Sequence, residues 1–167
     1  MRRAWLLTLG LCGLLWLGGA GGASKVAAER GRTDGPFTHL QVGESATVDV
    51  RAETEWNWSG LLLLQGESYA LSVDPQDWWL DWFVVTNADG FTRENMVPFE
   101  PFRRMPDEQW FALIGAIGQS LDDAFLIGTE ATYTVTTSGL FYSFANDMPA
   151  FYFNNHGHVQ LTITRLD

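Results

Sequence analysis

Cysteine is almost absent from this chain of 167 residues. The single cysteine, Cys12, lies inside an apolar run close to the N-terminus. Residues 24–167 therefore contain no thiol, which excludes disulfides, cysteine metal ligands and cysteine nucleophiles from that part of the chain. A domain without disulfides needs a sufficient hydrophobic core or another stabilising element, such as a bound metal ion.

Basic side chains are also scarce. The whole chain has 10 Lys and Arg against 20 Asp and Glu, a formal net charge of −10. Removal of Arg2 and Arg3 would leave 8 basic against 20 acidic side chains, a net charge of −12. Since phosphate backbones are bound by Lys and Arg, this composition argues against a nucleic-acid partner. An acidic surface attracts cations, although a solvated acidic surface alone also explains the composition.

Long apolar runs are limited to one, from Ala4 to Leu17. It follows Arg2-Arg3 and precedes the small residues Gly18 to Ser24, which is the order of a secretory signal peptide. A retained N-terminal anchor is the alternative. No later run is long enough for a membrane span, so none is expected in the mature chain. We therefore predict an exported protein, secreted or periplasmic, with a signal peptide over residues 1–23, a flexible leader over 24–37 and one domain over 38–167.

Amphipathic helical stripes are missing as well. No stretch from Thr38 onward keeps apolar residues at i, i+3, i+4 and i+7 for three turns. Short apolar or alternating runs between turn residues predict strands instead, over 46–51, 61–64, 68–73, 78–86, 110–117, 124–127, 131–136, 140–145 and 158–166. The segment 92–107, which holds three prolines, predicts an irregular surface loop. Many short strands with turns at this spacing predict an all-β fold, either a sandwich or a barrel.

The segment between the last two expected strands concentrates side chains that suit turns and metal ions. Asn146-Asp147 stands at its start, Asn154-Asn155 stands near its end, and Gly157 follows. Calcium prefers oxygen ligands and accepts carboxylates, amide carbonyls and backbone carbonyls. Both asparagines can reach one ion only if the backbone bends there, which Gly157 helps to allow. From composition alone, a calcium-binding loop and a plain cluster of Asx turns are both open.

The same segment resembles the metal loop of the PA-IL family, the calcium-dependent galactose-binding lectins of bacteria. That family's pattern is Asn-Asp-x-Pro, a few residues, and then Asn-Asn-x-Gly before an alternating last strand. Here the pattern reads Asn146-Asp147-Met148-Pro149 and Asn154-Asn155-His156-Gly157. Upstream segments resemble the family in the same order, and they are Trp56 to Leu61, Gly66-Glu67, 112–118, 125–128 and 138–141. The resemblance implies a jelly-roll-like antiparallel β-sandwich that binds sugar and is not an enzyme.

Carried over to this sequence, the resemblance implies a Ca²⁺ site. Its ligands would be Asp147, Asn154, Asn155, the backbone carbonyl of Phe151, and a carbonyl near Trp79 to Asp81 that we assign to Asp81 or Leu80. In such lectins the ion holds vicinal hydroxyls of the carbohydrate directly. Contacts to the sugar are accordingly expected from Asp147, Asn154, Asn155 and Tyr152. Aromatic residues that could stack on a sugar, or alternatively pack in the core or at its rim, are Tyr152, Phe153, Trp79 and Trp82.

One departure from the family concerns the choice of sugar. The galactose binders use a His and a Gln from a His-Pro-Asp-Gln run, where this chain has Val97-Pro98. The segment Met105 to Gln109 is similar to that run but is displaced and lacks the His. Galactose specificity is therefore not implied. The leading prediction is an exported calcium-dependent carbohydrate-binding protein, and the alternative is a calcium-stabilised structural or adhesion module that binds no sugar.

Overall fold

Residues 37–167 are the part of the chain that this computed structural model describes, and they form ten β-strands and two 3₁₀ helices. The predicted signal peptide, and all of the leader except Phe37, lie outside the described residues. The strands are β1 (Ser45–Arg51), β2 (Asn57–Leu63), β3 (Ser68–Val73), β4 (Trp79–Asp81), β5 (Val84–Thr86), β6 (Leu113–Ile117), β7 (Ala124–Leu126), β8 (Glu130–Thr134), β9 (Gly139–Ala145) and β10 (Asn155–Arg165). The helices are η1 (Glu94–Phe102) and η2 (Pro149–Asn154).

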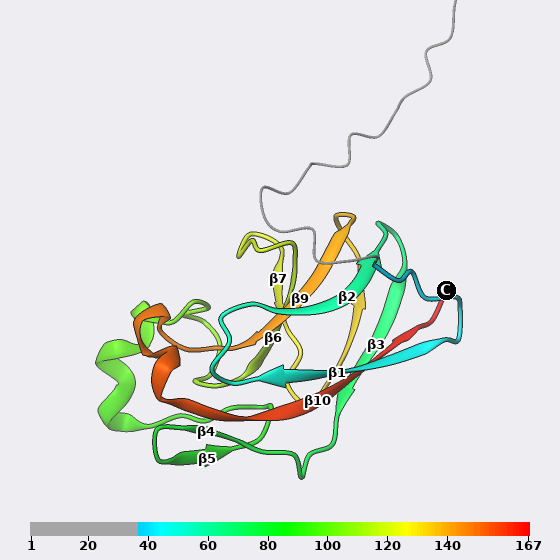
Figure 1. Cartoon of the computed structure of the whole chain (residues 1–167). Helices are drawn as coiled ribbons and strands as arrows, with labels where there is room; N and C mark the ends of the chain where they lie inside the picture. The colour runs from blue at the N-terminus through cyan, green and yellow to red at the C-terminus, as the bar shows by residue number, and fades with distance from the viewer. Residues whose placement is uncertain (1–36) are drawn as a thin grey trace, which may run out of the picture.

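The strands form two sheets that pack against each other (Figure 1). The larger sheet has the order β5-β4-β10-β3-β8, with β1 also paired to β10, and the smaller sheet has the order β2-β9-β6-β7. Every pairing between these strands is antiparallel. The predicted all-β antiparallel sandwich is therefore confirmed.

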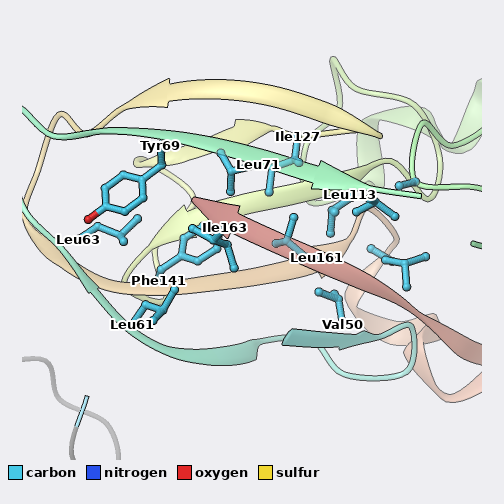
Figure 2. Packing of buried hydrophobic residues seen from close by; sticks show 14 of the residues in the cluster. Val50, Leu61, Leu63, Tyr69, Leu71, Leu113, Ile127, Phe141, Leu161 and Ile163 are labelled. Atoms are coloured by element: carbon cyan, nitrogen blue, oxygen red, sulfur yellow. The ribbon is translucent and has the colours of Figure 1, made fainter. Parts of the chain in front are cut away.

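Alternate side chains of the strands fill the space between the sheets. In β10, Val159, Leu161 and Ile163 are fully buried and Gln160 is exposed, as a period of two residues requires. Figure 2 shows Leu161 and Ile163 among apolar side chains from both sheets, which include Val50, Leu61, Leu63, Tyr69, Leu71, Leu113, Ile127 and Phe141. Burial of one such side chain contributes about 1.5–3 kcal/mol. This core supplies the cohesion that a chain without disulfides needs.

The proline-rich segment differs in part from its prediction. It lies at the surface, as expected, and none of the residues of η1 is buried. It is not irregular throughout, because residues 94–102 form the 3₁₀ helix η1 with Pro98 and Pro101 inside it. Proline lacks a backbone N–H and breaks an α-helix, but short helical turns tolerate it. Within residues 37–167, no helix is long and apolar enough to cross a membrane.

The single strand predicted over 78–86 is wrong. The structure has a hairpin there, in which β4 and β5 pair through Asp81 and Val84 and the chain reverses at Trp82-Phe83. Two-residue hairpin turns usually carry Gly, Asn or Asp. Because two aromatic residues occupy this turn, no residue typical of a turn marks its position.

The first residues of β10 define one end of the sandwich. Here β10 pairs with β4, and Asn155 lies opposite Asp81. Further along, β10 pairs with β1 on one side and β3 on the other. Figure 1 shows η1, η2 and the β4–β5 hairpin gathered at the end where β10 begins. The segments that hold the predicted site residues therefore meet in one place.

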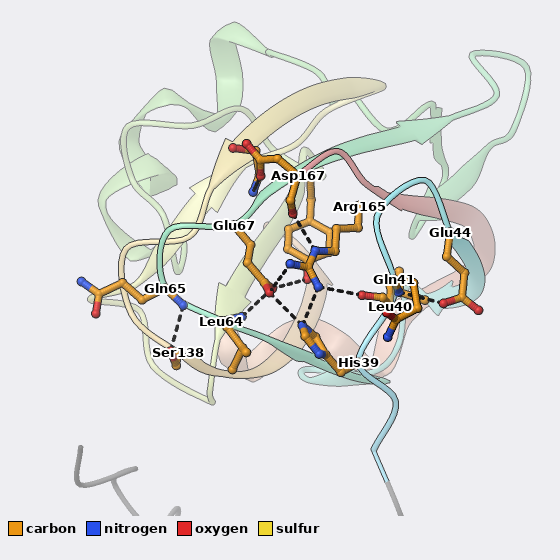
Figure 3. Close-up of polar contacts among 12 residues, drawn as sticks. His39, Leu40, Gln41, Glu44, Leu64, Gln65, Glu67, Ser138, Arg165 and Asp167 are labelled. Carbon is orange, nitrogen blue, oxygen red and sulfur yellow. Dashed lines mark hydrogen bonds and ion pairs between the residues drawn. The ribbon is translucent and has the colours of Figure 1, made fainter. Parts of the chain in front are cut away.

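The last residues of β10 define the opposite end, where a polar cluster centres on Glu67 (Figure 3). The Glu67 carboxylate lies 2.8 Å from both Arg165 Nη2 and His39 Nε2. It also accepts hydrogen bonds from the Tyr69 hydroxyl at 2.6 Å and the backbone N–H of Leu64 at 3.0 Å. This cluster ties the start of the described chain and the β2–β3 turn to the end of β10.

Candidate functional site

Four residues with oxygen-bearing side chains lie on the segments that meet where β10 begins, and they are Asp81, Asp147, Asn154 and Asn155. Asp81 ends β4 and lies opposite Asn155, the first residue of β10. Asp147 follows β9, and η2 carries the chain from there to Asn154 and Asn155. A hydrogen bond of 3.0 Å from Asn155 Nδ2 to Asp147 Oδ2 joins the two sides. The structure thus brings Asp147 into contact with Asn155, places Asn154 next to them in the chain, and adds Asp81, on which the charge of Asp147 acts.

The two carboxylates are buried. Asp81 is 8% exposed and Asp147 is 2% exposed. Burial, together with the negative charge of Asp147, raises the pKa of Asp81 to about 6, against an opposing effect of Arg93. Burial also raises the pKa of Asp147, although hydrogen bonds from Asn155 and from the backbone N–H of Met148 oppose that rise. Two buried acids that repel each other favour either a shared proton or a bound cation.

The two asparagines each carry a buried amide oxygen without a hydrogen-bond partner, Oδ1 of Asn154 and Oδ1 of Asn155. In Asn155 the amide nitrogen faces two acceptors, the Asp147 carboxylate and, at 3.4 Å, the carbonyl of Ala52. The nitrogen is fixed by these contacts, so the oxygen has to point the other way. Buried polar groups without a partner are rare and call for an explanation, such as a bound ion.

This set of donors fits a hard cation. It consists of two carboxylates and two amide oxygens, which are the ligand types that calcium combines in proteins. In residues 37–167 there is no group of three or more His, Cys, Asp and Glu side chains that could hold a metal ion. Asp81 was predicted to contribute a backbone carbonyl. In the structure its side chain is buried, and the negative charge of Asp147 raises its pKa. Phe151 lies within η2, three residues before Asn154, where its backbone carbonyl remains the predicted ligand.

Asn146 holds the segment before Asp147 in place. It is fully buried, and its amide bonds to the backbone of the 105–109 segment. The amide oxygen accepts from the N–H of Met105 at 2.9 Å, and the amide nitrogen donates to the carbonyls of Met105 and Gln109 at 2.8 and 3.0 Å. A side chain with this many internal bonds is a structural clamp, so the adjacent Asp147 lies on a rigid support. Sequence reasoning did not identify this role.

Arg104 provides a second support beneath η2. Its guanidinium lies 3.5 Å from the ring centroid of Phe144 and 4.0 Å from that of Trp56. Its Nη1 donates to the Tyr152 hydroxyl at 3.1 Å, and its backbone N–H donates to the carbonyl of Asp147 at 3.1 Å. The Tyr152 hydroxyl in turn donates to the carbonyl of Ala145. These contacts fix both ends of the loop that carries the predicted ligands.

The four aromatic candidates for sugar contact separate into two groups. Tyr152 is 4% exposed with its hydroxyl engaged, and Trp79 is fully buried against Phe111. Both therefore pack inside the protein, and the geometry gives no support to Tyr152 as a ligand contact. Trp82 and Phe153 are 68% and 78% exposed and directly flank Asp81 and Asn154 in the chain. Of the four candidates, only these two have rings exposed enough to contact a ligand.

Four other polar or exposed residues that could have had a functional role are surface residues or support the fold. His156 and His158 are exposed on β10. Val97, which the resemblance aligns with the His of the galactose binders, is an exposed residue of η1. Asn57, the acceptor position of an Asn-Trp-Ser sequence, has a side chain that is occupied by bonds to the backbone of Arg51, and it is 9% exposed. It is therefore poorly placed for glycosylation.

Comparison with known proteins places this fold beside a lectin. A solved structure described as "EclA N-terminal domain; PllA-like lectin" matches with a TM-score of 0.53 and 19% sequence identity. The match covers 71% of this chain and 94% of that chain. No family model matches the sequence, and no curated protein matches it either. The chain therefore has a lectin-like β-sandwich fold. A likeness at this identity concerns the fold alone, so membership of the PA-IL family stays a prediction.

Proposed function

We propose that this chain is an exported carbohydrate-binding protein whose sugar is held through a calcium ion at Asp81, Asp147, Asn154 and Asn155. The observation that carries the proposal is the pair of buried carboxylates beside two buried amide oxygens that have no partner. The lectin-like fold supports the same conclusion, because the site lies on a scaffold that a PllA-like lectin also has. Export rests on the predicted signal peptide.

In this proposal the site residues bind the calcium ion, and Asp147 also contacts the sugar. When bound, calcium supplies a double positive charge that polarises the hydroxyl groups of a sugar. Asp147 is suited to accept hydrogen bonds from such hydroxyls, because a carboxylate makes short, charge-assisted bonds. Its orientation is fixed by donors to both of its oxygens, Met148 N–H at 2.7 Å and Asn155 Nδ2 at 3.0 Å. A fixed acceptor loses little entropy when a ligand binds.

A glycan array tests the proposal directly. The mature protein should retain glycans in the presence of calcium and lose them when a chelator is added. Asp147→Asn should abolish the retention, because it removes one of the two negative charges of the site. Asp122→Asn is the matched control, since Asp122 is an exposed acid on a turn away from the site, and it should behave like the wild type. Retention that persists in chelator would contradict metal-mediated binding.

The alternative is a calcium-stabilised module that binds no sugar. It is favoured by the exposed Val97 where a sugar-selecting His would stand in the galactose binders. The same samples separate the two possibilities. Calcium that raises the melting temperature while no glycan is retained would establish the structural module and exclude the carbohydrate-binding function.

A further inference from the structure

The turn between β4 and β5 has a sequence that its own geometry does not favour. It is a two-residue turn, with Asp81 and Val84 paired on either side of Trp82 and Phe83. Trp82 has a φ of 52°, in the left-handed region. Gly, Asn and Asp are the usual residues at such positions, because a side chain with a bulky Cβ substituent is strained there. A tryptophan at this position is therefore conformationally strained.

Both residues of the turn are also exposed. The exposed fraction is 68% for Trp82 and 63% for Phe83. Their rings lie 4.8 Å apart with a tilt of 52°, and the Arg93 guanidinium lies 5.7 Å from the centroid of the Phe83 ring. The two rings therefore have an ordered arrangement without contributing to the core. Strain and exposure in the same place are typical of functional positions, where stability is given up for another purpose.

The turn is directly attached to the candidate calcium site. Trp82 follows Asp81 in the chain, and its backbone N–H donates to the carbonyl of Asn154 at 3.2 Å. Trp82 is therefore the covalent neighbour of one site residue, Asp81, and is hydrogen-bonded to another, Asn154. Across the same contact, Phe153 precedes Asn154 and is 78% exposed. Aromatic side chains thus stand on both segments that meet at the site.

We propose that Trp82 is a specificity-determining residue that stacks on the C–H face of the bound sugar, with Phe83 as its support. This inference rests on the proposed function. A pyranose has hydroxyl oxygens at its edge and C–H groups on its faces, so an ion and an aromatic ring can bind it at the same time. The ligand class is a pyranoside that presents an uninterrupted C–H face beside the two hydroxyls that bind the ion. A rigid aromatic ring supplies contact area at a low cost in entropy.

The test uses variants that remove the ring and keep the turn. Asn tolerates a positive φ, so Trp82→Asn should have the melting temperature of the wild type or a higher one. Calcium should stabilise it as it stabilises the wild type. Its affinity for the glycan that the wild type binds best on the array should fall on the order of tenfold, which is equivalent to about 1.4 kcal/mol, because the stacked ring is lost. Trp82→Tyr should recover most of that affinity.

Trp78→Asn is the matched control, because Trp78 is 59% exposed and precedes the same strand outside the turn. It should leave the affinity unchanged. Equal affinities of Trp82→Asn and the wild type would overturn the inference while leaving the calcium-dependent lectin intact. Loss of the calcium response, or a change in oligomeric state in sedimentation, would also overturn it, because the turn would then serve the ion or a protein interface. A wild type that retains no glycan in calcium would overturn this inference and the proposed function together.

Discussion

The two ends of strand β10 hold buried acids in opposite ways. At the end near Arg165, burial alone would raise the pKa of Glu67, but hydrogen bonds from Tyr69, Leu64 and His39 outweigh it, and the pKa is lowered. At the other end, burial and the negative charge of Asp147 raise the pKa of Asp81 to about 6, and burial raises the pKa of Asp147 as well. One end therefore stabilises a negative charge, and the other end resists it.

The two ends also differ in their ion pairs. Glu67 has Arg165 at 2.8 Å, and Arg165 in turn donates to the carbonyl of Leu40 at 3.0 Å (Figure 3). Among residues 37–167, the positive charge that lowers the pKa of Asp81 is that of Arg93, and the same end has two amide oxygens without partners. An uncompensated buried charge is destabilising, and none of the ion pairs formed within residues 37–167 involves Asp81 or Asp147. A calcium ion would compensate the negative charge at this end, as Arg165 compensates the charge of Glu67 at the other end.

The largest expected effect on stability comes from substitution of Glu67, at the end of β10 near Arg165. Glu67→Gln removes the charge that pairs with Arg165, which is itself mostly buried, with 16% of its side chain exposed. We expect the free energy of unfolding to fall by about 3 kcal/mol, with or without calcium, because a buried cation is left unpaired. Urea unfolding measures it. Glu53→Gln is the control, since its ion pair with Arg51 is exposed and should contribute less than about 1 kcal/mol. Similar losses in both variants would remove the contrast between a buried and an exposed pair.

Removal of a buried carboxylate at the other end of β10 should raise the free energy of unfolding instead of lowering it. Asp81→Asn removes a buried charge that repels Asp147. In chelator at pH 7 we expect the free energy of unfolding to rise by about 1–2 kcal/mol, because an ionised Asp81 is destabilising there. With calcium the order should reverse, and the wild type should be the more stable protein. Asp81→Asn that destabilises the protein in chelator would show that Asp81 already has a compensating partner.

A smaller effect concerns pH. A carboxyl whose pKa is raised on folding binds protons more tightly in the folded state, so its contribution to stability falls as the pH rises from about 4 to about 6. Glu67 acts in the other direction, and its contribution is lost as the pH falls below its ordinary value. In chelator, the urea midpoint of the wild type should therefore decline between pH 4 and 6 relative to that of Asp81→Asn. Parallel profiles of the two proteins would contradict the raised pKa.

Regular strands were the part of the fold that the sequence predicted well. Residues 68–73 show an alternation of polar and apolar side chains, with Gly66 before them and the Asp74-Pro75 turn after them. Strand β3 has these bounds. The β4–β5 hairpin was missed because Trp82-Phe83 carries no turn residue. The start of β10 at Asn155 was missed as well, since Asn155 to Gly157 has low strand propensity and is held by pairing with β4. Tertiary contacts decided both cases.

The sequence predicted that part of the candidate site lies in one loop, and it did not predict how the rest of the fold supports that loop. The motif around Asp147 and Asn154-Asn155 indicated oxygen ligands in one loop, and the structure brings these residues together. The Asp81 side chain could not be predicted from that loop, because it lies on another strand and reaches the site through a cross-strand pair. The clamp by Asn146 depends on backbone groups of residues 105–109, which no local pattern reveals.

Calcium titration by isothermal calorimetry tests the central claim most directly. After chelation and dialysis, the wild-type protein should bind one calcium ion per chain, and Asp147→Asn should give no binding heat. Asp122→Asn should match the wild type, since its carboxylate is exposed on a distant turn. An absence of calcium binding to the wild type, or equal binding to Asp147→Asn, would contradict the assignment of this end of β10 as a metal site.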